Sequence, residues 1–480
     1  MKRWRTVAIF CVALTSLLAR LAEAQLRSTL ARNTPLDQYV AKDDGVYQWK
    51  VINTDEESGL TTLIVDMTSQ RWRTADEVDR TLWKHWLVIA RPEKVVSNIG
   101  FVFISGGSNR GGPPSGPSEI VKQLARATNT VVAELRMVPN QPLEFHHDGK
   151  QRSEDDLIAY CWDQFLKTGD PTWLPRFPMA KSAVRAMDTI TALLASDHGG
   201  RHKVNRFVVA GGSKRGWATW ITAAVDRRVV AIVPIVIDIL NVTKSMNHHF
   251  AAYGFFSPAV WDYVRHKITA RQNTPEMEAL RRNVDPYEYR DRLTMPKYIV
   301  NASGDQFFVP DSSQFYFDDL KGEKYLRYVP NGEHSLRGTD ARDSIAAFYW
   351  AIINHKPRPK FDWSFEPDGA IRVKVQDRPK EVYLWQATNP NARDFRVEVI
   401  GRTYTKTVLK PQEDGTYVAR VDKPATGFRA YYVELVYDIG APYPLKLTTA
   451  VRIVPDVLPF ADKDPSKAGR ARHRSRKSRK

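Results

Sequence analysis

Short apolar runs and helical patterns alternate between residues 99 and 353, and this alternation constrains the fold more than any other feature of the chain. The runs are rich in Val and Ile, as expected for strands that are buried on both faces of a sheet. Helices between such strands can cover both faces. The alternation predicts an α/β fold with a doubly wound, mostly parallel sheet. We expect strands at residues 99–104, 130–135, 204–210, 229–237, 298–302 and 325–329, and helices at 118–127, 179–195, 217–225 and 341–353.

Four segments depart from this alternation. Residues 36–91 have a β-rich pattern. Residues 136–178 and a stretch at about 239–293, rich in Tyr, Phe, His and Arg, interrupt the sheet pattern, and the second predicts a lid over the sheet. Short alternating segments separated by turn residues predict an Ig-like or fibronectin-like β-sandwich at residues 357–460. Its strands are expected at residues 371–375, 381–386, 395–400, 417–421 and 431–437.

The first 24 residues have the features of a secretory signal peptide. Basic residues at 2–5 precede an apolar run at 6–18, and an Ala-Glu-Ala cleavage pattern ends at Ala24. The apolar run is shorter than the roughly 20 residues that a membrane span needs. We therefore predict a secreted or periplasmic protein that is not transmembrane, with a signal peptide at 1–24 and the sheet domain at 25–356.

The net charge of +17 is unevenly distributed, and part of it lies in a basic tail at residues 461–480. Between Lys467 and Lys480 the tail has eight Lys or Arg residues and no acid. Two interpretations stay open: a disordered, solvated appendage, or an arm that binds an anionic surface. Because no aromatic residues lie among these cations, we predict no specific nucleic-acid partner. Cys161 would be alone after removal of the signal peptide, so no internal disulfide is expected.

Ser213 lies where an expected strand runs into a glycine-rich turn. Residues 208–217 read Val-Val-Ala-Gly-Gly-Ser-Lys-Arg-Gly-Trp, and an expected helix follows. This is the context of a nucleophile elbow, in which a strained serine exposes Oγ and the helix N-terminus faces a developing oxyanion. The usual spacing is Gly-x-Ser-x-Gly. Here the second glycine is displaced by one position to Gly216, and Arg215 takes a place that is normally small.

Two further residues follow later strands in the order that this chemistry requires. Asp305 comes after the strand at 298–302, and His334 comes after the strand at 325–329. In hydrolases of the α/β class the order is Ser, Asp, His, where the histidine accepts the serine proton and the acid orients the histidine. Asp238, which ends the strand before the predicted lid, is a rival acid. The paired histidines of the chain lack an HExxH motif, so we predict neither a metal nor a cofactor.

The remaining predicted site residues surround the elbow. The turn after the first parallel strand is where such folds place an oxyanion donor, so we expect one N–H from Gly107 or Ser108 and another from Lys214. The cations that follow the serine leave two interpretations open. Arg215 pairs with a core carboxylate such as Asp238, or one cation faces the cleft and binds an anionic substrate group. The predicted substrate-binding residues are Arg215 and Trp217.

Several motifs resemble those of the PhoPQ-activated pathogenicity-related proteins, whose relatives include the autocrine proliferation repressors. They are Leu-Asp-Gln-Tyr-Val at 36–40, Thr-Ser-Gln-Arg-Trp at 68–72, Gly-Gly-Ser-Asn at 106–109 and Gly-Gly-Ser-Lys-Arg-Gly-Trp at 211–217. The resemblance runs from about residue 30 to 455. It implies an α/β-hydrolase core with a C-terminal β-sandwich. The elbow is also similar to that of glucuronoyl esterases.

Two hypotheses of different classes follow. The first is a secreted serine hydrolase that cleaves an ester or peptide bond through Ser213, His334 and Asp305. Its substrate would be a small-molecule ester, a saccharide ester or a peptide. The second is a non-catalytic secreted signalling or binding protein, of virulence or growth-repressor type, on the same fold. Fold alone cannot separate the two, but a non-catalytic protein has no need to keep the three residues in order.

Overall fold

The computed structural model describes residues 33–57 and 59–467. The predicted signal peptide at 1–24 lies outside the described residues. The basic tail is described only as far as residue 467. Within the described ranges, no helix has both the length and the apolar character needed to cross a membrane.

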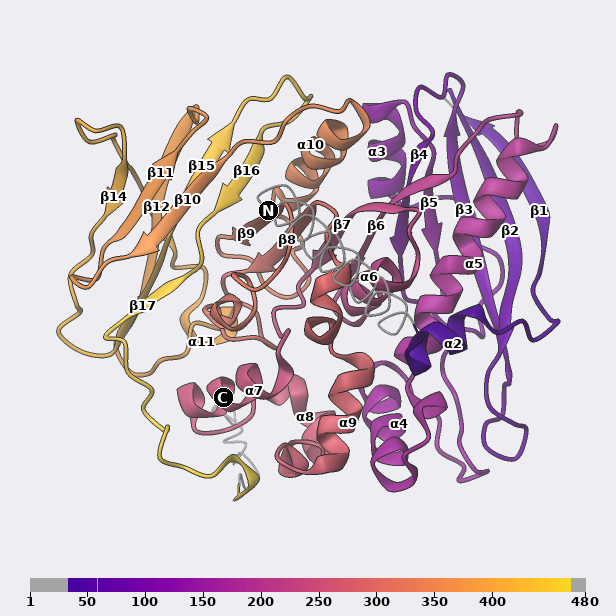
Figure 1. Ribbon diagram of the computed structural model, residues 1–480, viewed down its shortest axis with the longest axis horizontal. Coiled ribbons are helices and arrows are strands. Elements are labelled where there is room, and N and C mark those ends of the chain that lie inside the picture. The colour runs from indigo at the N-terminus through magenta and orange to yellow at the C-terminus, as the bar shows by residue number, and fades with distance from the viewer. Residues whose placement is uncertain (1–32, 58, 468–480) are drawn as a thin grey trace, which may run out of the picture.

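A large mixed sheet forms the centre of the molecule (Figure 1). In the described chain its order is β1-β2-β3-β5-β4-β6-β7-β8-β9-β16-β15-β12-β13, with β17 paired to β15. The run from β5 to β9 is parallel, whereas β1, β2 and β3 are antiparallel. The predicted α/β fold with a mostly parallel central sheet is confirmed. The strands of this part are β1 (Gln48–Glu57), β2 (Leu60–Arg71), β3 (Leu82–Pro92), β4 (Ile99–Ile104), β5 (Val132–Leu135), β6 (Arg206–Gly212), β7 (Val229–Ile235), β8 (Lys297–Ala302) and β9 (Lys324–Val329).

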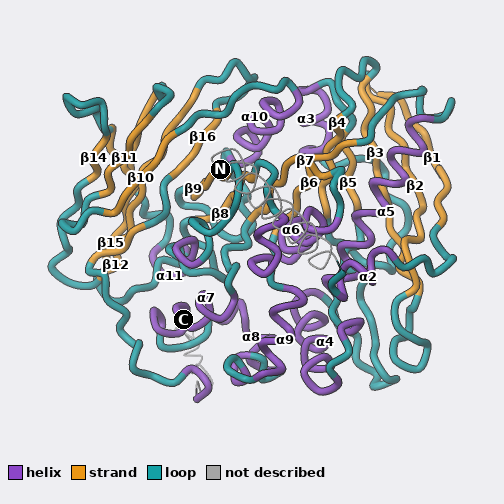
Figure 2. Tube along the Cα trace, viewed as in Figure 1, coloured by secondary structure: helices purple, strands orange, loops and turns teal. Residues whose placement is uncertain are grey.

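Alternate residues of the parallel strands face two separate cores, as the pleat of a strand requires. In β6, Val209 packs with α5 and α6 on one face, and Val208 packs with α3 and α10 on the other. Helices therefore flank the strands on both sides (Figure 2), which explains why successive positions are apolar. The helices are α2 (Pro35–Ala41), α3 (Glu119–Thr128), α4 (Glu154–Thr168), α5 (Arg176–Ala195), α6 (Lys214–Val225), α7 (Val242–Tyr253), α8 (Trp261–Arg265), α9 (Pro275–Val284), α10 (Ala341–Ile353) and α11 (Val397–Ile400).

The two excursions from the sheet pattern are helical and gather at one end of the sheet. Residues 136–178 contain α4, and residues 239–293 contain α7, α8 and α9. These helices lie together at the bottom of the view in Figure 1, and α4 contacts both α8 and α9. The second excursion is therefore a helical layer that packs against the first at the same end of the sheet. Its role as a lid stays a prediction.

The strands after residue 357 extend the central sheet and add a second sheet. β16 (Leu445–Thr448) joins β9 through one residue pair, Thr448 with Leu326, and β15, β12 and β13 follow. A separate sheet consists of β10, β11 and β14. A distinct β-sandwich domain at 357–460 stays a prediction. The remaining strands are β10 (Phe361–Phe365), β11 (Ile371–Val375), β12 (Glu381–Asn389), β13 (Thr405–Val408), β14 (Tyr417–Ala419), β15 (Phe428–Tyr437) and β17 (Arg452–Val454).

One predicted strand is wrong. Residues 395–400 contain the short helix α11 and no strand. The segment packs on the loop after β8, where the Val397 N–H donates to Gly304 O at 3.0 Å. The apolar residues that suggested a strand therefore contact a loop near the predicted acid, and a ladder of backbone hydrogen bonds with a neighbouring strand does not form.

Candidate active site

Ser213 occupies the turn between β6 and α6 with a strained backbone. Its φ of 56° and ψ of −125° lie outside the regions that most residues with side chains adopt. The Ser213 N–H donates to Ile235 O at 2.8 Å. A methyl group at Gly216 would come within 2.9 Å of Gly211 O, so α6 can pack this close to β6 only because residue 216 has no side chain. The strand, turn and helix of a nucleophile elbow are all present.

Asp305 and His334 come from the loops after β8 and β9 and contact each other directly. The His334 Nδ1 atom lies 3.0 Å and 2.9 Å from the two carboxylate oxygens of Asp305. Asp305 Oδ1 also accepts a hydrogen bond from Phe307 N at 2.7 Å. The Phe307 ring packs on the imidazole, with ring centroids 4.1 Å apart. Because Nδ1 is engaged by the carboxylate, Nε2 is the nitrogen that remains to accept a proton.

The rival acid Asp238 has different partners. Its carboxylate is 2% exposed and accepts hydrogen bonds from the hydroxyls of Tyr316 and Tyr328, each at 2.7 Å. Burial raises the pKa of Asp238 to about 7, although the two tyrosine hydroxyls favour the ionised form. The geometry therefore supports Asp305, and not Asp238, as the acid that orients His334.

Arg215 is engaged by a carboxylate from α4. Its two terminal nitrogens donate to the two oxygens of Glu154 at 2.7 Å and 2.6 Å, and its Nε donates to Val138 O at 2.6 Å. The ion pair suggested by the sequence is therefore formed, but its acid is Glu154 and not Asp238. Arg215 is also absent from the described residues that line the cavity beside the serine. Its predicted substrate-binding role stays a prediction.

Lys214 is the first residue of α6, and its side chain points to the same acidic pair. Its Nζ lies 2.7 Å from Glu154 and 3.1 Å from the neighbouring Asp155. Burial acts to raise the pKa of Glu154, but hydrogen bonds and charge from Arg215 and Lys214 outweigh it and hold the pKa below its usual range. The Lys214 side chain is thereby held in place, while its backbone N–H lies at the helix N-terminus that a developing oxyanion would face.

The predicted second oxyanion turn lies beside Arg215. A methyl group on Gly106 would come within 2.6 Å of Arg215 Nη2, so Arg215 contacts this turn as well as the elbow. Gly107 has a φ of 130°, which residues with a side chain rarely adopt. Gly107 and Ser108 are both exposed. Their role as oxyanion donors stays a prediction, as does that of Lys214.

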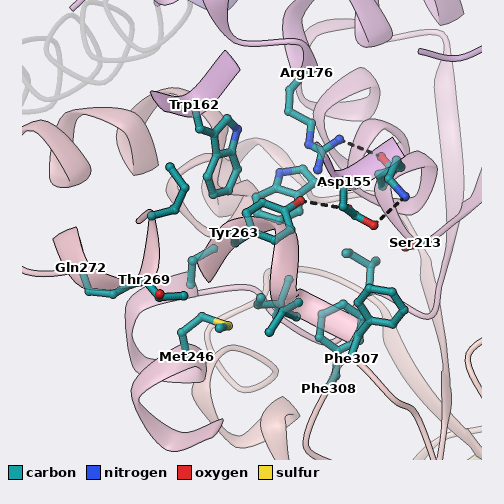
Figure 3. Close-up of a pocket in the computed structure, with 17 residues that line it drawn as sticks. Asp155, Trp162, Arg176, Ser213, Met246, Tyr263, Thr269, Gln272, Phe307 and Phe308 are labelled. Carbon is teal, nitrogen blue, oxygen red and sulfur yellow. Dashed lines mark hydrogen bonds and ion pairs between the residues drawn. The ribbon is translucent and has the colours of Figure 1, made fainter. Parts of the chain in front are cut away.

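A small cavity of about 50 Å³ lies beside Ser213 (Figure 3). It is bounded by both helical excursions, the elbow and the loop after β8. Ser213 and Phe307 both line it, so the Phe307 ring connects the histidine to the cavity of the serine. Within the described ranges, no hydrogen bond joins Ser213 to His334. Most of the wall is apolar, including Trp162, Ile237, Val242, Met246 and Phe308.

Trp217 forms part of the same wall. Its Nε1 donates to Val284 O at 2.5 Å, and its ring packs edge-on against Trp162 with centroids 5.8 Å apart. The indole is only 4% exposed, so a substrate could contact it only through the cavity. Its predicted substrate-binding role stays a prediction.

Sequence reasoning missed the polar residues that α4 and α8 bring to the elbow. The Tyr263 hydroxyl donates to Asp155 Oδ1 at 3.0 Å, and both residues line the cavity. Ser153 followed by three acids is a typical first turn of a helix and could have placed Glu154 and Asp155 at a helix N-terminus. In the described chain, no group of three or more His, Cys, Asp or Glu side chains could hold a metal ion.

Comparison with known protein sequences gives two findings. The sequence model of the family described as PhoPQ-activated pathogenicity-related protein matches residues 36–396. Autocrine proliferation repressor protein A of Dictyostelium discoideum is 40% identical over 458 residues, which cover 89% of this chain and 92% of that protein. The second match extends over both the central sheet and the strands after residue 357.

Comparison with solved structures gives weaker similarities. Acetyl xylan esterase 1 from Thermoanaerobacterium sp. JW/SL YS485 aligns with a TM-score of 0.48 and 12% identity, over 68% of this chain and 93% of that chain. Glucuronoyl esterase from Solibacter usitatus aligns with a TM-score of 0.38 and 14% identity, over 67% of this chain and 92% of that chain.

Proposed function

This chain belongs to the PhoPQ-activated pathogenicity-related protein family, and with that as the premise we propose that it is a serine hydrolase. Ser213 is the nucleophile, His334 the base and Asp305 the acid that orients the base. The observation that carries the proposal is the contact between Asp305 and His334, together with the Phe307 ring that joins the imidazole to the cavity of Ser213. A binding protein would need neither an oriented imidazole nor a strained serine.

The proposed reaction passes through an acyl-enzyme. Ser213 Oγ attacks the carbonyl carbon of the substrate while His334 Nε2 takes the hydroxyl proton, and the same proton then leaves with the alcohol or amine. Water repeats the sequence and releases the acid. Asp305 keeps the proton of His334 on Nδ1 and stabilises the imidazolium. In the absence of substrate such serine–histidine contacts are often long and shorten when the substrate binds.

The oxyanion would be stabilised from two sides of the elbow. One donor is the Lys214 N–H at the start of α6, and the other comes from the turn at Gly107 and Ser108. The contacts of Arg215 with Glu154 and with the Gly106 turn support this assignment, because they tie the two donors to one another. We therefore assign Arg215 a positioning role.

A fluorophosphonate probe tests the proposal, since it labels activated serines covalently. Wild-type protein should be labelled, and Ser213→Ala should abolish labelling and lower ester hydrolysis by several orders of magnitude. Ser364→Ala is the matched control, because Ser364 is exposed on β10 and should leave both readouts unchanged. Circular dichroism checks that the variants are folded. Labelling of Ser213→Ala at the wild-type rate would place the nucleophile elsewhere.

A second candidate function is a secreted signalling or binding protein without turnover. The name of the Dictyostelium relative, a proliferation repressor, favours this candidate. Under it, the folded wild-type protein should neither react with the probe nor hydrolyse any ester. The probe experiment therefore decides between the two.

We also propose that the substrate is a small-molecule ester, a saccharide ester or a peptide and that the protein acts outside the cytoplasm, in the periplasm or as a secreted protein. The second statement rests on the signal-like sequence at residues 1–24. Mass spectrometry of the extracytoplasmic protein should find Gln25 as its first residue. An intact Met1 would contradict it.

A further inference from the structure

Arg176 is a buried guanidinium in the wall of the cavity beside Ser213. It is the first residue of α5 and is 1% exposed. Figure 3 shows it close to Trp162, Tyr263 and Asp155 at the same cavity. Neither the predicted chemistry nor the proposed reaction uses it. A charged side chain buried in a largely apolar wall therefore needs its own explanation.

The contacts of this guanidinium are weak. Its Nη1 reaches only Lys214 O at 3.5 Å and Met179 Sδ at 3.4 Å, and its Nε has no hydrogen-bond partner. The guanidinium lies 4.7 Å from the centre of the Trp217 ring. Within residues 33–57 and 59–467, no carboxylate forms an ion pair with it. Burial accordingly lowers the pKa of Arg176, although the Tyr263 hydroxyl and Asp155 act in the opposite direction.

The nearby carboxylates are already shared by other cations. Glu154 contacts both Lys214 and Arg215, and Asp155 contacts Lys214 and the Tyr263 hydroxyl. Counting Arg176, this cluster of described residues has three cations and two carboxylates, which is an excess of one positive charge. Because burying an unpaired charge costs several kcal/mol, a protein is expected to keep one only where a ligand completes the pair.

We propose that Arg176 is a specificity-determining residue that binds a carboxylate carried by the substrate. The proposal rests on the proposed serine hydrolase activity. The preferred substrates are then esters with a short anionic group, since a cavity of about 50 Å³ has room for only a few water molecules. The planar fork of arginine suits a carboxylate because it can donate two parallel hydrogen bonds. The carboxylate belongs to the acyl group or to the alcohol, and the two cases need separate substrates.

Two pairs of matched esters test this inference. Ethyl hydrogen glutarate against ethyl hexanoate places the charge on the acyl side, and O-butyrylglycolate against propyl butyrate places it on the alcohol side. A pH-stat measures kcat/KM for each. In wild-type protein one anionic ester should exceed its neutral partner by at least about tenfold, the range of one charge-assisted hydrogen bond. No preference in either pair, with the neutral esters hydrolysed in a Ser213-dependent manner, overturns the inference and leaves the proposed function standing.

Variants assign the preference to Arg176. Arg176→Met should lower the ratio of anionic to neutral kcat/KM by at least about tenfold, and Arg176→Lys should lower it less, since it keeps a charge without the fork. Arg185→Met is the matched control on the same helix, where Arg185 pairs with Asp188 at 3.1 Å and does not line the cavity. It should keep the wild-type ratio. An unchanged ratio in Arg176→Met refutes the assignment.

A measurement on wild-type protein covers the case in which Arg176→Met does not fold. Glutarate should slow labelling by the fluorophosphonate probe at a concentration at least about tenfold lower than glutaramide, its neutral analogue. Equal concentrations for the two compounds refute anion binding at this site. If no ester is hydrolysed and no labelling occurs, the proposed function and the inference both fall.

Discussion

Replacing Asp305 by Asn tests the acid assignment and changes few atoms. In the structure Asp305 Oδ1 accepts from Phe307 N at 2.7 Å, and Oδ2 is the closer oxygen to His334 Nδ1, at 2.9 Å. The backbone donor should hold the asparagine oxygen at the Oδ1 position, which places the NH₂ group against Nδ1. An N–H donor there favours the tautomer with the proton on Nε2, and that tautomer cannot accept the proton of Ser213.

The size of the effect follows from this tautomer. When the acid of a serine hydrolase triad is replaced by its amide and the geometry is kept, kcat falls by about 10⁴, equivalent to about 5.5 kcal/mol of transition-state stabilisation. We expect a loss of about 10³ to 10⁴ for Asp305→Asn. Asp238→Asn should lose less than about tenfold, because Asp238 bonds two tyrosine hydroxyls and does not contact His334.

The assay compares kcat/KM for a neutral ester between the two variants and the wild type. Circular dichroism and urea unfolding establish that both variants are folded at the assay temperature. If Asp238→Asn is the more damaging of the two, the acid assignment is wrong. Equal losses with equal destabilisation would mean that both residues act through the fold.

Two further predictions concern stability and positioning. Burial raises the pKa of Asp238 in the folded protein to about 7, against about 4 in the unfolded chain. Between these two pH values the folded protein therefore binds more protons than the unfolded chain. The free energy of unfolding consequently falls as the pH rises from about 4 to about 7. Asp238→Asn should remove this pH dependence. Between pH 4 and 7 its free energy of unfolding, measured in urea, should rise by up to about 4 kcal/mol relative to that of the wild type, at about 1.4 kcal/mol per pKa unit. If the free energy of unfolding changes with pH in the same way in both proteins, the prediction is wrong. Arg215→Lys loses the two-pronged contact with Glu154 and the Nε contact with Val138, and should cost about 1–3 kcal/mol of stability and lower kcat/KM equally for anionic and neutral esters. A selective loss on the anionic ester would instead show that Arg215 contacts the substrate.

The parallel strands could be predicted because the pattern that identifies each strand lies within its own sequence. Both β4 at residues 99–104 and α10 at residues 341–353 match their predicted bounds. Burial on both faces forces a continuous apolar run, and no knowledge of the neighbours is needed to recognise it. In contrast, β13 (Thr405–Val408) is exposed along its whole length and has no alternation to detect.

The site could be predicted only where chain order constrains it. Ser213, Asp305 and His334 each follow a strand of the parallel set, so the topology alone places them at one edge of the sheet. The partner of Arg215 could not be predicted, because Glu154 lies 61 residues away in an excursion that had no assigned helix. Arg176 was missed for a different reason: the helix predicted at residues 179–195 begins three residues earlier in the structure, and its first residue lines a cavity that segments distant in sequence complete.

The join between β9 and β16 has a consequence for any shortened version of this protein. Arg327 on β9 has no exposed surface and pairs with Glu434 of β15 and with Asp340. Tyr328 N donates to the Thr448 hydroxyl at 3.0 Å. A chain cut near residue 356 would lose Glu434 and Thr448 together. Arg327 would then keep only Asp340, the Tyr328 N–H would lose its acceptor, and the edge of β9 would be uncovered. An uncovered strand edge can pair with strands of other molecules, so we expect a chain shortened at this point to aggregate.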